Sequence, residues 1–203
     1  MAKVPTHTET ALRIAKTRGI ARSRDFRAAG VPAPYLTRLS RQGKLVRLSR
    51  GLYQLADVKD HHAAHDLAEA ARLVPHGVVS LVSALHVHGL TTQLPRSVWL
   101  MLPSKARAPK QTPFPCEIVR ASGPALSAGL ATISVEGVDV PITNAAKTVA
   151  DCFKYRRRVG ADVALEALRD ALRRRKVTRK DLWHYAGICR VRAVMRPYLE
   201  ALA

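Results

Sequence analysis

The chain has 203 residues, of which 47% are hydrophobic and 24% are charged. This length suits one or two domains with a substantial core, and it excludes small disulfide-stapled and collagen-like proteins. Lys and Arg number 34 against 15 Asp and Glu, which gives a net charge of +19. An excess of this size indicates a polyanionic partner.

The positive charge is concentrated at the two ends of the chain. Residues 1–56 hold 12 basic and 2 acidic residues, residues 57–151 hold 8 of each, and residues 152–203 hold 14 basic and 5 acidic residues. This distribution predicts a neutral folded body that carries two basic surfaces. We expect a short DNA-binding domain over residues 1–57 and a second domain over residues 58–203.

Neither a membrane segment nor a disulfide framework is indicated. No apolar stretch approaches the roughly 18 residues that span a bilayer, and no apolar run follows the N-terminal residues. We therefore expect a cytoplasmic protein with no membrane partner. Cys116, Cys152 and Cys189 lack C-x-x-C spacing, which favours buried thiols in a reducing compartment.

The first basic block has the pattern of three short helices. Thr6 and Glu9 form a capping box, and Gly19 supplies a helix end. A second helix begins near Ser23 and is closed by glycine, and Pro34 suits the first turn of a third. Helices are therefore expected over residues 7–18, 23–29 and 34–42.

A hairpin follows these helices. Two β-rich runs, 44–48 and 52–55, flank the polar turn Ser49-Arg50-Gly51. Three helices and a hairpin in this order predict a winged helix-turn-helix, in which arginine reads guanine edges or the minor groove and hydroxyls bind bases or phosphates. The expected DNA-binding residues are Arg22, Ser23, Arg24, Tyr35, Thr37, Arg38, Arg41, Arg47, Ser49 and Arg50. The alternative is that these side chains form a solvated surface.

The remainder of the chain mixes short strands with helices. Strands are expected at 78–80, 98–102 and 117–119, with a hairpin at 135–140 and helices over 61–73 and 146–153. A further helix opening near Gly160 is expected to turn Leu165, Leu168 and Leu172 inward. The fold class is therefore α+β, with a winged helix-turn-helix followed by a mixed α/β domain that ends in a helical segment.

The C-terminal helical segment has two further signals. Thr178 and Asp181 form a second capping box. Pro197 interrupts a late apolar stripe, which predicts a kink or a fresh helix start at that position.

Histidines supply the only candidate metal ligands. His61 and His65 are four residues apart, and His86 and His88 lie further along the chain. Because no acidic or thiolate third ligand has predictable placement beside them, surface histidines are the better interpretation. We expect neither a metal nor a cofactor.

Three stretches carry a resemblance to a known family. They are Gly30–Tyr53, Ser83–Leu90 and Val140–Asp151. With them the chain resembles the AbiEi antitoxins of type IV toxin–antitoxin systems over nearly its whole length. The third stretch is similar to the family signature Thr-x-x-x-Arg-Thr-x-x-Asp, with Lys147 in place of arginine, which keeps the charge and loses the planar fork.

The resemblance implies an antitoxin that is also a transcriptional autorepressor. Its winged helix would bind double-stranded promoter DNA with inverted repeats. Its second domain would counteract a co-encoded nucleotidyltransferase toxin without a stable complex. Some relatives are thought to promote phosphorylation of the toxin, which leaves a kinase-like activity as an alternative to the expected non-enzyme with no catalytic residues. The candidate antitoxin motif comprises Ser83, Thr143, Asn144, Lys147 and Asp151.

Two other functions remain open at this stage. A nucleic-acid-processing enzyme could use Ser83 with His86 or His88, although the acidic residues lack metal-binding spacing. A non-specific basic nucleic-acid binder would track phosphates with both basic ends. In a non-specific binder, and equally in a repressor, the C-terminal contacts to phosphate groups would be Arg156, Arg157, Arg158, Arg173, Arg174 and Arg175.

Overall fold

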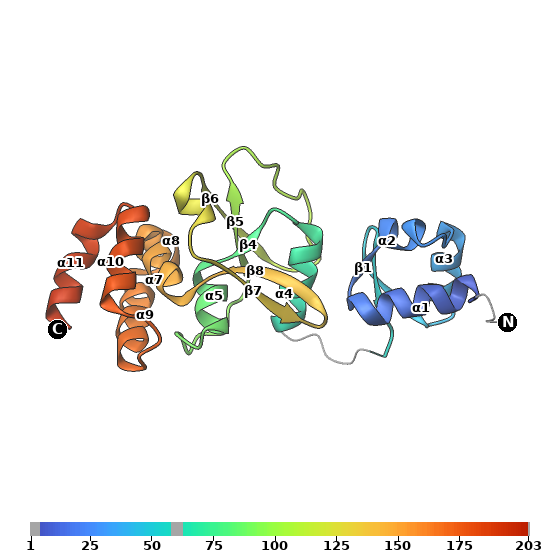
Figure 1. Ribbon diagram of the computed structural model, residues 1–203, viewed down its shortest axis with the longest axis horizontal. Helices are drawn as coiled ribbons and strands as arrows, with labels where there is room; N and C mark the ends of the chain where they lie inside the picture. The colour runs from blue at the N-terminus through green and yellow to red at the C-terminus, as the bar shows by residue number, and fades with distance from the viewer. Residues whose placement is uncertain (1–4, 58–62, 203) are drawn as a thin grey trace. The chain divides into compact units, whose positions relative to one another are not determined.

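The computed structural model describes residues 5–57 and 63–202, and they divide into two compact units (Figure 1). The first unit extends to Pro75 and also includes residues 134–140. The second comprises residues 76–133 and the chain from Pro141 onward. The predicted domain boundary at residue 57 adjoins residues 58–62, which lie outside the described part, so that boundary stays a prediction.

Three helices of the first unit follow the predicted pattern. They are α1 (His7–Arg18), α2 (Ser23–Ala28) and α3 (Ala33–Arg41), with α4 (Ala63–Leu73) after them. The capping box of α1 is confirmed, because the Glu9 backbone N–H donates to Thr6 Oγ1 at 3.2 Å and the Thr6 N–H donates to the Glu9 carboxylate at 2.7 Å. Helix α2 begins at Ser23 as expected, with Arg22 as its N-cap.

A three-stranded antiparallel sheet completes this part of the unit. Its strands are β1 (Ala21–Arg22), β2 (Leu45–Ser49) and β3 (Leu52–Leu55), in the order β1-β3-β2. Ala21 pairs with Tyr53, and Leu45 pairs with Leu55. The expected hairpin is therefore confirmed as β2–β3, while β1 was not expected from the sequence.

The apolar residues of the helices and the sheet form one core. Phe26 meets Tyr53 edge-on, with ring centroids 5.9 Å apart. Leu36 and Leu39 are buried on the inner face of α3 beside Leu45. Because this inner face is apolar, α3 is anchored by it and its polar side chains lie on the opposite face.

The second unit is built on a mixed five-stranded sheet. Its strand order is β6-β5-β4-β8-β7. The strands are β4 (Val78–Val79), β5 (Val98–Pro103), β6 (Cys116–Ala121), β7 (Leu130–Val135) and β8 (Val138–Thr143). Strand β4 is antiparallel to β5 and parallel to β8, and β5 is parallel to β6. The tip of the β7–β8 hairpin groups with the first unit.

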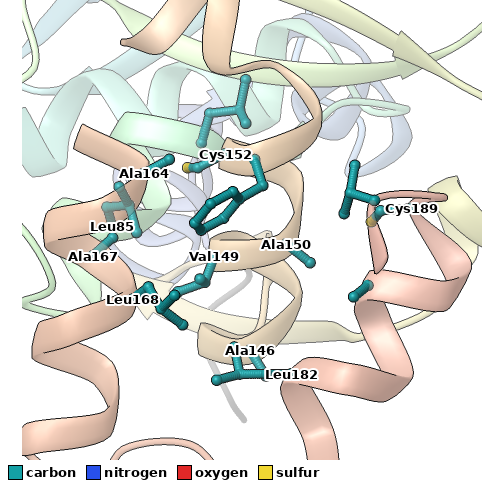
Figure 2. Packing of buried hydrophobic residues seen from close by; sticks show 14 of the residues in the cluster. Leu85, Ala146, Val149, Ala150, Cys152, Ala164, Ala167, Leu168, Leu182 and Cys189 are labelled. Atoms are coloured by element: carbon teal, nitrogen blue, oxygen red, sulfur yellow. The ribbon is translucent and has the colours of Figure 1, made fainter. Parts of the chain in front are cut away.

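Helices pack with this sheet around a core centred on α7 (Figure 2). The helices are α5 (Leu81–Val87), α6 (Pro124–Ser127), α7 (Ala145–Lys154), α8 (Arg156–Val159), α9 (Ala161–Arg173), α10 (Arg179–Ile188) and α11 (Arg192–Ala201). Val149 and Cys152 of α7 lie against the small residues Ala164 and Ala167 of α9 in the same cluster. The α+β class is confirmed.

Two expectations about the helical end were wrong in part. In α9, Leu168 is buried with a stripe of smaller residues and half-buried Leu172 packs against the core as expected, whereas Leu165 is only half-buried. Alanines allow α9 to approach its neighbours closely, and this close packing determines which face turns inward. Pro197 lies inside α11 and does not begin a new helix. The capping box at Thr178 and Asp181 is confirmed.

No helix in the described ranges 5–57 and 63–202 is long and apolar enough to cross a membrane.

Candidate nucleic-acid interface and buried motif

The outer face of α3 is the most direct candidate surface for DNA. Thr37, Arg38 and Arg41 are exposed on it. They line a shallow depression together with Ala33 and Pro34. A helix anchored by an apolar inner face, with arginines and a hydroxyl on its outer face, has the arrangement that a recognition helix needs to reach base edges in a major groove.

Tyr35 is held by its neighbours within the unit. Its ring lies edge-on to His7, with centroids 4.9 Å apart, and the Arg38 guanidinium lies 4.5 Å above it. Arg38 Nη2 also donates to Thr8 Oγ1 at 3.4 Å. These contacts orient Arg38 before any ligand binds, which lowers the entropy lost when the side chain is ordered on a target.

The wing places two of its three predicted residues in solvent. Arg47 and Arg50 are exposed, and Arg47 Nε donates to the Ser49 carbonyl at 3.4 Å. Ser49 differs from expectation, because its Oγ is buried and has no hydrogen-bond partner among the described residues. The hairpin register shifts between Arg47 and Ser49, and Gly51 adopts a φ of +80° in the turn.

The start of α2 is attached to this turn. The Ser23 backbone N–H donates to the Gly51 carbonyl at 2.8 Å, and the Arg22 N–H donates to Asp25 Oδ2 at 2.8 Å. Arg24 is exposed beside them. Burial, followed by repulsion from Arg24 and Arg72, lowers the pKa of Arg22. The structure thus brings the predicted residues of α2 and the wing turn together on one electropositive part of the unit.

The candidate antitoxin motif lies at the start of α7 and inside the core of the second unit. Asn144 is the N-cap: its Oδ1 accepts the Lys147 backbone N–H at 2.9 Å, and its Nδ2 donates to the Tyr185 hydroxyl at 2.9 Å. Thr143 Oγ1 lies 2.7 Å from Thr148 Oγ1, and the Thr143 carbonyl accepts from His88 Nε2 at 2.7 Å. These contacts connect β8, α5, α7 and α10.

Lys147 and Asp151 form a buried ion pair one helical turn apart. Lys147 Nζ donates to both Asp151 oxygens, at 2.7 and 2.6 Å, and both residues are 0% exposed. Cys189 Sγ adds a third hydrogen bond to Asp151 at 3.2 Å. Burial raises the pKa of Asp151 although Lys147 opposes the shift, and burial raises the pKa of Cys189 to about 12, so the thiol keeps the proton that it donates.

Ser83 is separate from the other four motif residues. Its Oγ accepts the Trp99 N–H at 2.9 Å and donates to the Ser97 carbonyl at 3.2 Å. Among the described residues it has no hydrogen bond to His86 or His88, so the apo arrangement supplies no nucleophile and base. Ser83 instead links α5 to the start of β5.

His65 is not the surface residue that the sequence indicated. His61 lies outside the described residues. His65 is buried, and its Nδ1 donates to Glu136 Oε2 at 2.9 Å, where Gln54 Nε2 also donates at 3.3 Å. Across residues 5–57 and 63–202, no group of three or more His, Cys, Asp or Glu residues could hold a metal ion.

Some of the predicted phosphate-binding arginines in residues 152–203 have side-chain partners within the described part of the protein, and others do not. Arg158 donates to Glu117 Oε2 at 2.6 Å, and Arg173 and Arg174 pair with Asp170 at 2.8 and 3.0 Å. Arg156 donates to the Phe153 carbonyl. Within the described ranges, the side chains of Arg157 and Arg175 have no hydrogen bond or ion pair and are exposed. The predicted phosphate contacts are thus not equally available.

The first unit has the architecture of a winged helix-turn-helix, a class of DNA-binding fold: three helices, a small antiparallel sheet and a β2–β3 wing. Residues 9–56 match the family model described as "Transcriptional regulator, AbiEi antitoxin". This match lies within the first unit.

One solved structure extends the fold comparison beyond that module. The crystal structure of RV2827C protein from Mycobacterium tuberculosis is similar to this chain with a TM-score of 0.63 and 16% sequence identity. The similarity covers 91% of this chain and 72% of that one. At this identity it shows a shared fold. No curated protein matches the chain.

Proposed function

We propose that this chain represses its own operon by binding inverted repeats in promoter DNA through the winged helix. The observation that carries the proposal is the outer face of α3, where Thr37, Arg38 and Arg41 are exposed on a helix whose opposite face is anchored in the core. The family model adds the regulatory role over the same residues. Arg47 and Arg50 of the wing would follow the adjacent groove.

Alanine variants of the exposed arginines of α3 distinguish sequence-specific DNA binding from non-specific binding to phosphates. Replacing Arg38 or Arg41 by alanine is expected to lower affinity for the native upstream duplex by about 1 to 3 kcal/mol, because a bidentate contact to a base edge is lost. Arg173→Ala is expected to reduce the salt dependence of binding and to leave the sequence preference intact. Mobility-shift titrations at two salt concentrations, against the upstream duplex and a scrambled duplex of equal length, measure both effects.

Arg13→Ala supplies a matched control for this experiment. Arg13 is exposed on α1 and belongs to no predicted contact, so the variant loses the same charge from the same unit. Equal losses for Arg13→Ala and Arg38→Ala, or equal losses on native and scrambled duplexes, would establish non-specific polyanion binding and contradict the repressor function.

The proposal assigns antagonism of a co-encoded nucleotidyltransferase toxin to the second unit. Its support is the antitoxin description of the family model, which matches residues 9–56 of the first unit. Expression of this chain is expected to restore growth to cells arrested by the product of the neighbouring gene. A variant with both Arg38→Ala and Arg41→Ala is expected to restore growth equally, because these side chains lie in the first unit. Failure of the unmodified chain to restore growth would refute the antitoxin function for that gene pair.

A further inference from the structure

The second unit contains a cavity of about 840 Å³ that opens to solvent. It lies where the end of β6, the loop before α6, the end of α7 and the connection from α10 to α11 meet. Its volume is within the range of small-molecule sites, roughly 300 to 1,000 Å³. None of the motif residues or predicted phosphate contacts lines it.

The lining of this cavity is positively charged. Arg120, Lys154, Arg190 and Arg192 contribute to it, with His184, and the lining residues include no Asp or Glu. Asp151 accepts a hydrogen bond from the lining residue Cys189, but this carboxylate is already paired with Lys147. A concave surface with several cations and no carboxylate concentrates a positive potential, which selects anions.

Two of the guanidinium groups are held in place by backbone groups. Arg120 Nη1 donates to the carbonyls of Pro103 and Ala106, which leaves its other N–H groups available. Arg192 Nε donates to the Trp183 carbonyl at 3.3 Å, and its guanidinium lies 5.1 Å above the Trp183 ring. A Cβ at Gly187 would lie 2.7 Å from Arg192 Nη2, so only glycine leaves room for this arrangement.

Arg190 occupies a backbone position that normally favours glycine. It follows the C-cap of α10 with a φ of +59°. Its N–H donates to the Gly187 carbonyl at 3.1 Å, and the Val191 N–H donates to the Ala186 carbonyl at 2.8 Å, which is the Schellman arrangement. In the described part of the chain, the Arg190 side chain has no hydrogen bond or ion pair. A cation without a partner, held in strained backbone at a cavity wall, fits a ligand-binding role.

We infer that this cavity binds a small oligophosphate anion, from pyrophosphate to the triphosphate group of a nucleotide. Arginine guanidinium groups donate to phosphate oxygens in pairs, and several fixed cations match an anion that carries several charges. A compact anion fits a cavity better than the phosphates of duplex DNA do, because the latter are spread along the outside of a helix. The site is independent of the winged helix and of the function proposed for it.

Arg190→Gly tests this inference with little risk to the fold. Glycine adopts the positive φ without strain, so the variant is expected to melt at the same temperature as the parent or higher, while it loses one cation from the cavity. Calorimetric titration of the full chain with pyrophosphate and, separately, with ATP is expected to show binding at about 150 mM salt that Arg190→Gly weakens at least tenfold. Binding of ATP but not of pyrophosphate would identify a nucleotide site, and comparable binding of both would identify a phosphate site.

Arg175→Gly is the matched control. Arg175 follows the C-cap of α9 with a φ of +52° and the same pair of backbone hydrogen bonds, and it does not line the cavity. The affinity of Arg175→Gly for both ligands is expected to stay within twofold of the parent, because the nucleic-acid contact predicted for Arg175 is not part of the cavity lining. The inference is overturned if neither ligand binds, if both variants weaken binding equally, or if a 20-base-pair duplex occupies the cavity in an Arg190-dependent manner in place of the small anions.

Discussion

Replacing Lys147 by methionine is expected to lower the free energy of unfolding of the second unit by about 3 to 5 kcal/mol, because the variant leaves the Asp151 carboxylate buried without its cation. Both side chains are 0% exposed, so water cannot replace the lost contacts without a rearrangement of the core. The two tryptophans, Trp99 and Trp183, both lie in the second unit. Tryptophan fluorescence during urea unfolding therefore reports on this unit.

A double variant separates the ion pair from the packing around it. Lys147→Met combined with Asp151→Ala removes both charges, so it is expected to cost clearly less than the sum of the two single variants. Strict additivity would mean that the two charges do not stabilise each other, and the interpretation of the pair would then be wrong.

The pH dependence of the single Lys147→Met variant has a definite sign. Burial already raises the pKa of Asp151, and Lys147 opposes this shift. Without Lys147 the folded-state pKa rises further above the unfolded value, so the folded state takes up a proton that the unfolded state releases. The stability deficit of the variant is therefore expected to be largest at neutral pH and to shrink as the pH falls toward the unfolded pKa.

The ion pair also shows what the sequence predicted and what it did not. The spacing of Lys147 and Asp151 on one helical face was evident, and helix α7 was predicted. The complete burial of the pair was not, because it depends on α10, which supplies Cys189 and Tyr185 from some forty residues away. In this structure these buried atoms position the start of α7.

Local signals predicted most of the fold. Capping boxes and glycine ends are encoded within four or five residues, so α1 and α10 were predicted from the sequence. Strand β1 has only two residues and forms because it pairs with β3. A segment this short has no periodic pattern from which it could be predicted. The buried face of α9 is set by close packing against other helices, so it includes Ala164, Ala167 and Ala171 beside the predicted Leu168.

The basic cavity was missed for a similar reason. From the sequence, the predicted C-terminal phosphate contacts were the consecutive arginines 156–158 and 173–175, because a run of basic residues is a recognisable sequence pattern. Arg120, Lys154 and Arg190 are each at least thirty residues apart, and only the fold brings them to one cavity. The available signal was indirect: Arg190 directly follows a helical stretch, where glycine is the usual residue.

Gly129→Ala is expected to destabilise the second unit by about 2 to 4 kcal/mol, the combined cost of a left-handed backbone and an overpacked core. Gly129 has a φ of +67°, and a Cβ there would lie 2.8 Å from Lys147 Cβ and 2.9 Å from Tyr185 Cε1. Its carbonyl accepts the Asn144 N–H at 2.7 Å, so a displaced backbone would also disturb the N-cap of α7. Urea unfolding followed by tryptophan fluorescence measures the loss.

Gly89→Ala isolates the backbone contribution in the same unit. Gly89 has a φ of +62°, and the nearest atom to its added Cβ is Lys176 Nζ at 3.5 Å, an ordinary contact. This variant is therefore expected to lose only about 1 to 2 kcal/mol. The difference between the two losses in free energy of unfolding measures the steric clash of the added Cβ at Gly129 with Lys147 and Tyr185. If the two losses are equal, the close approach at Gly129 contributes nothing to the loss, and the start of α7 tolerates the shift that an added Cβ requires.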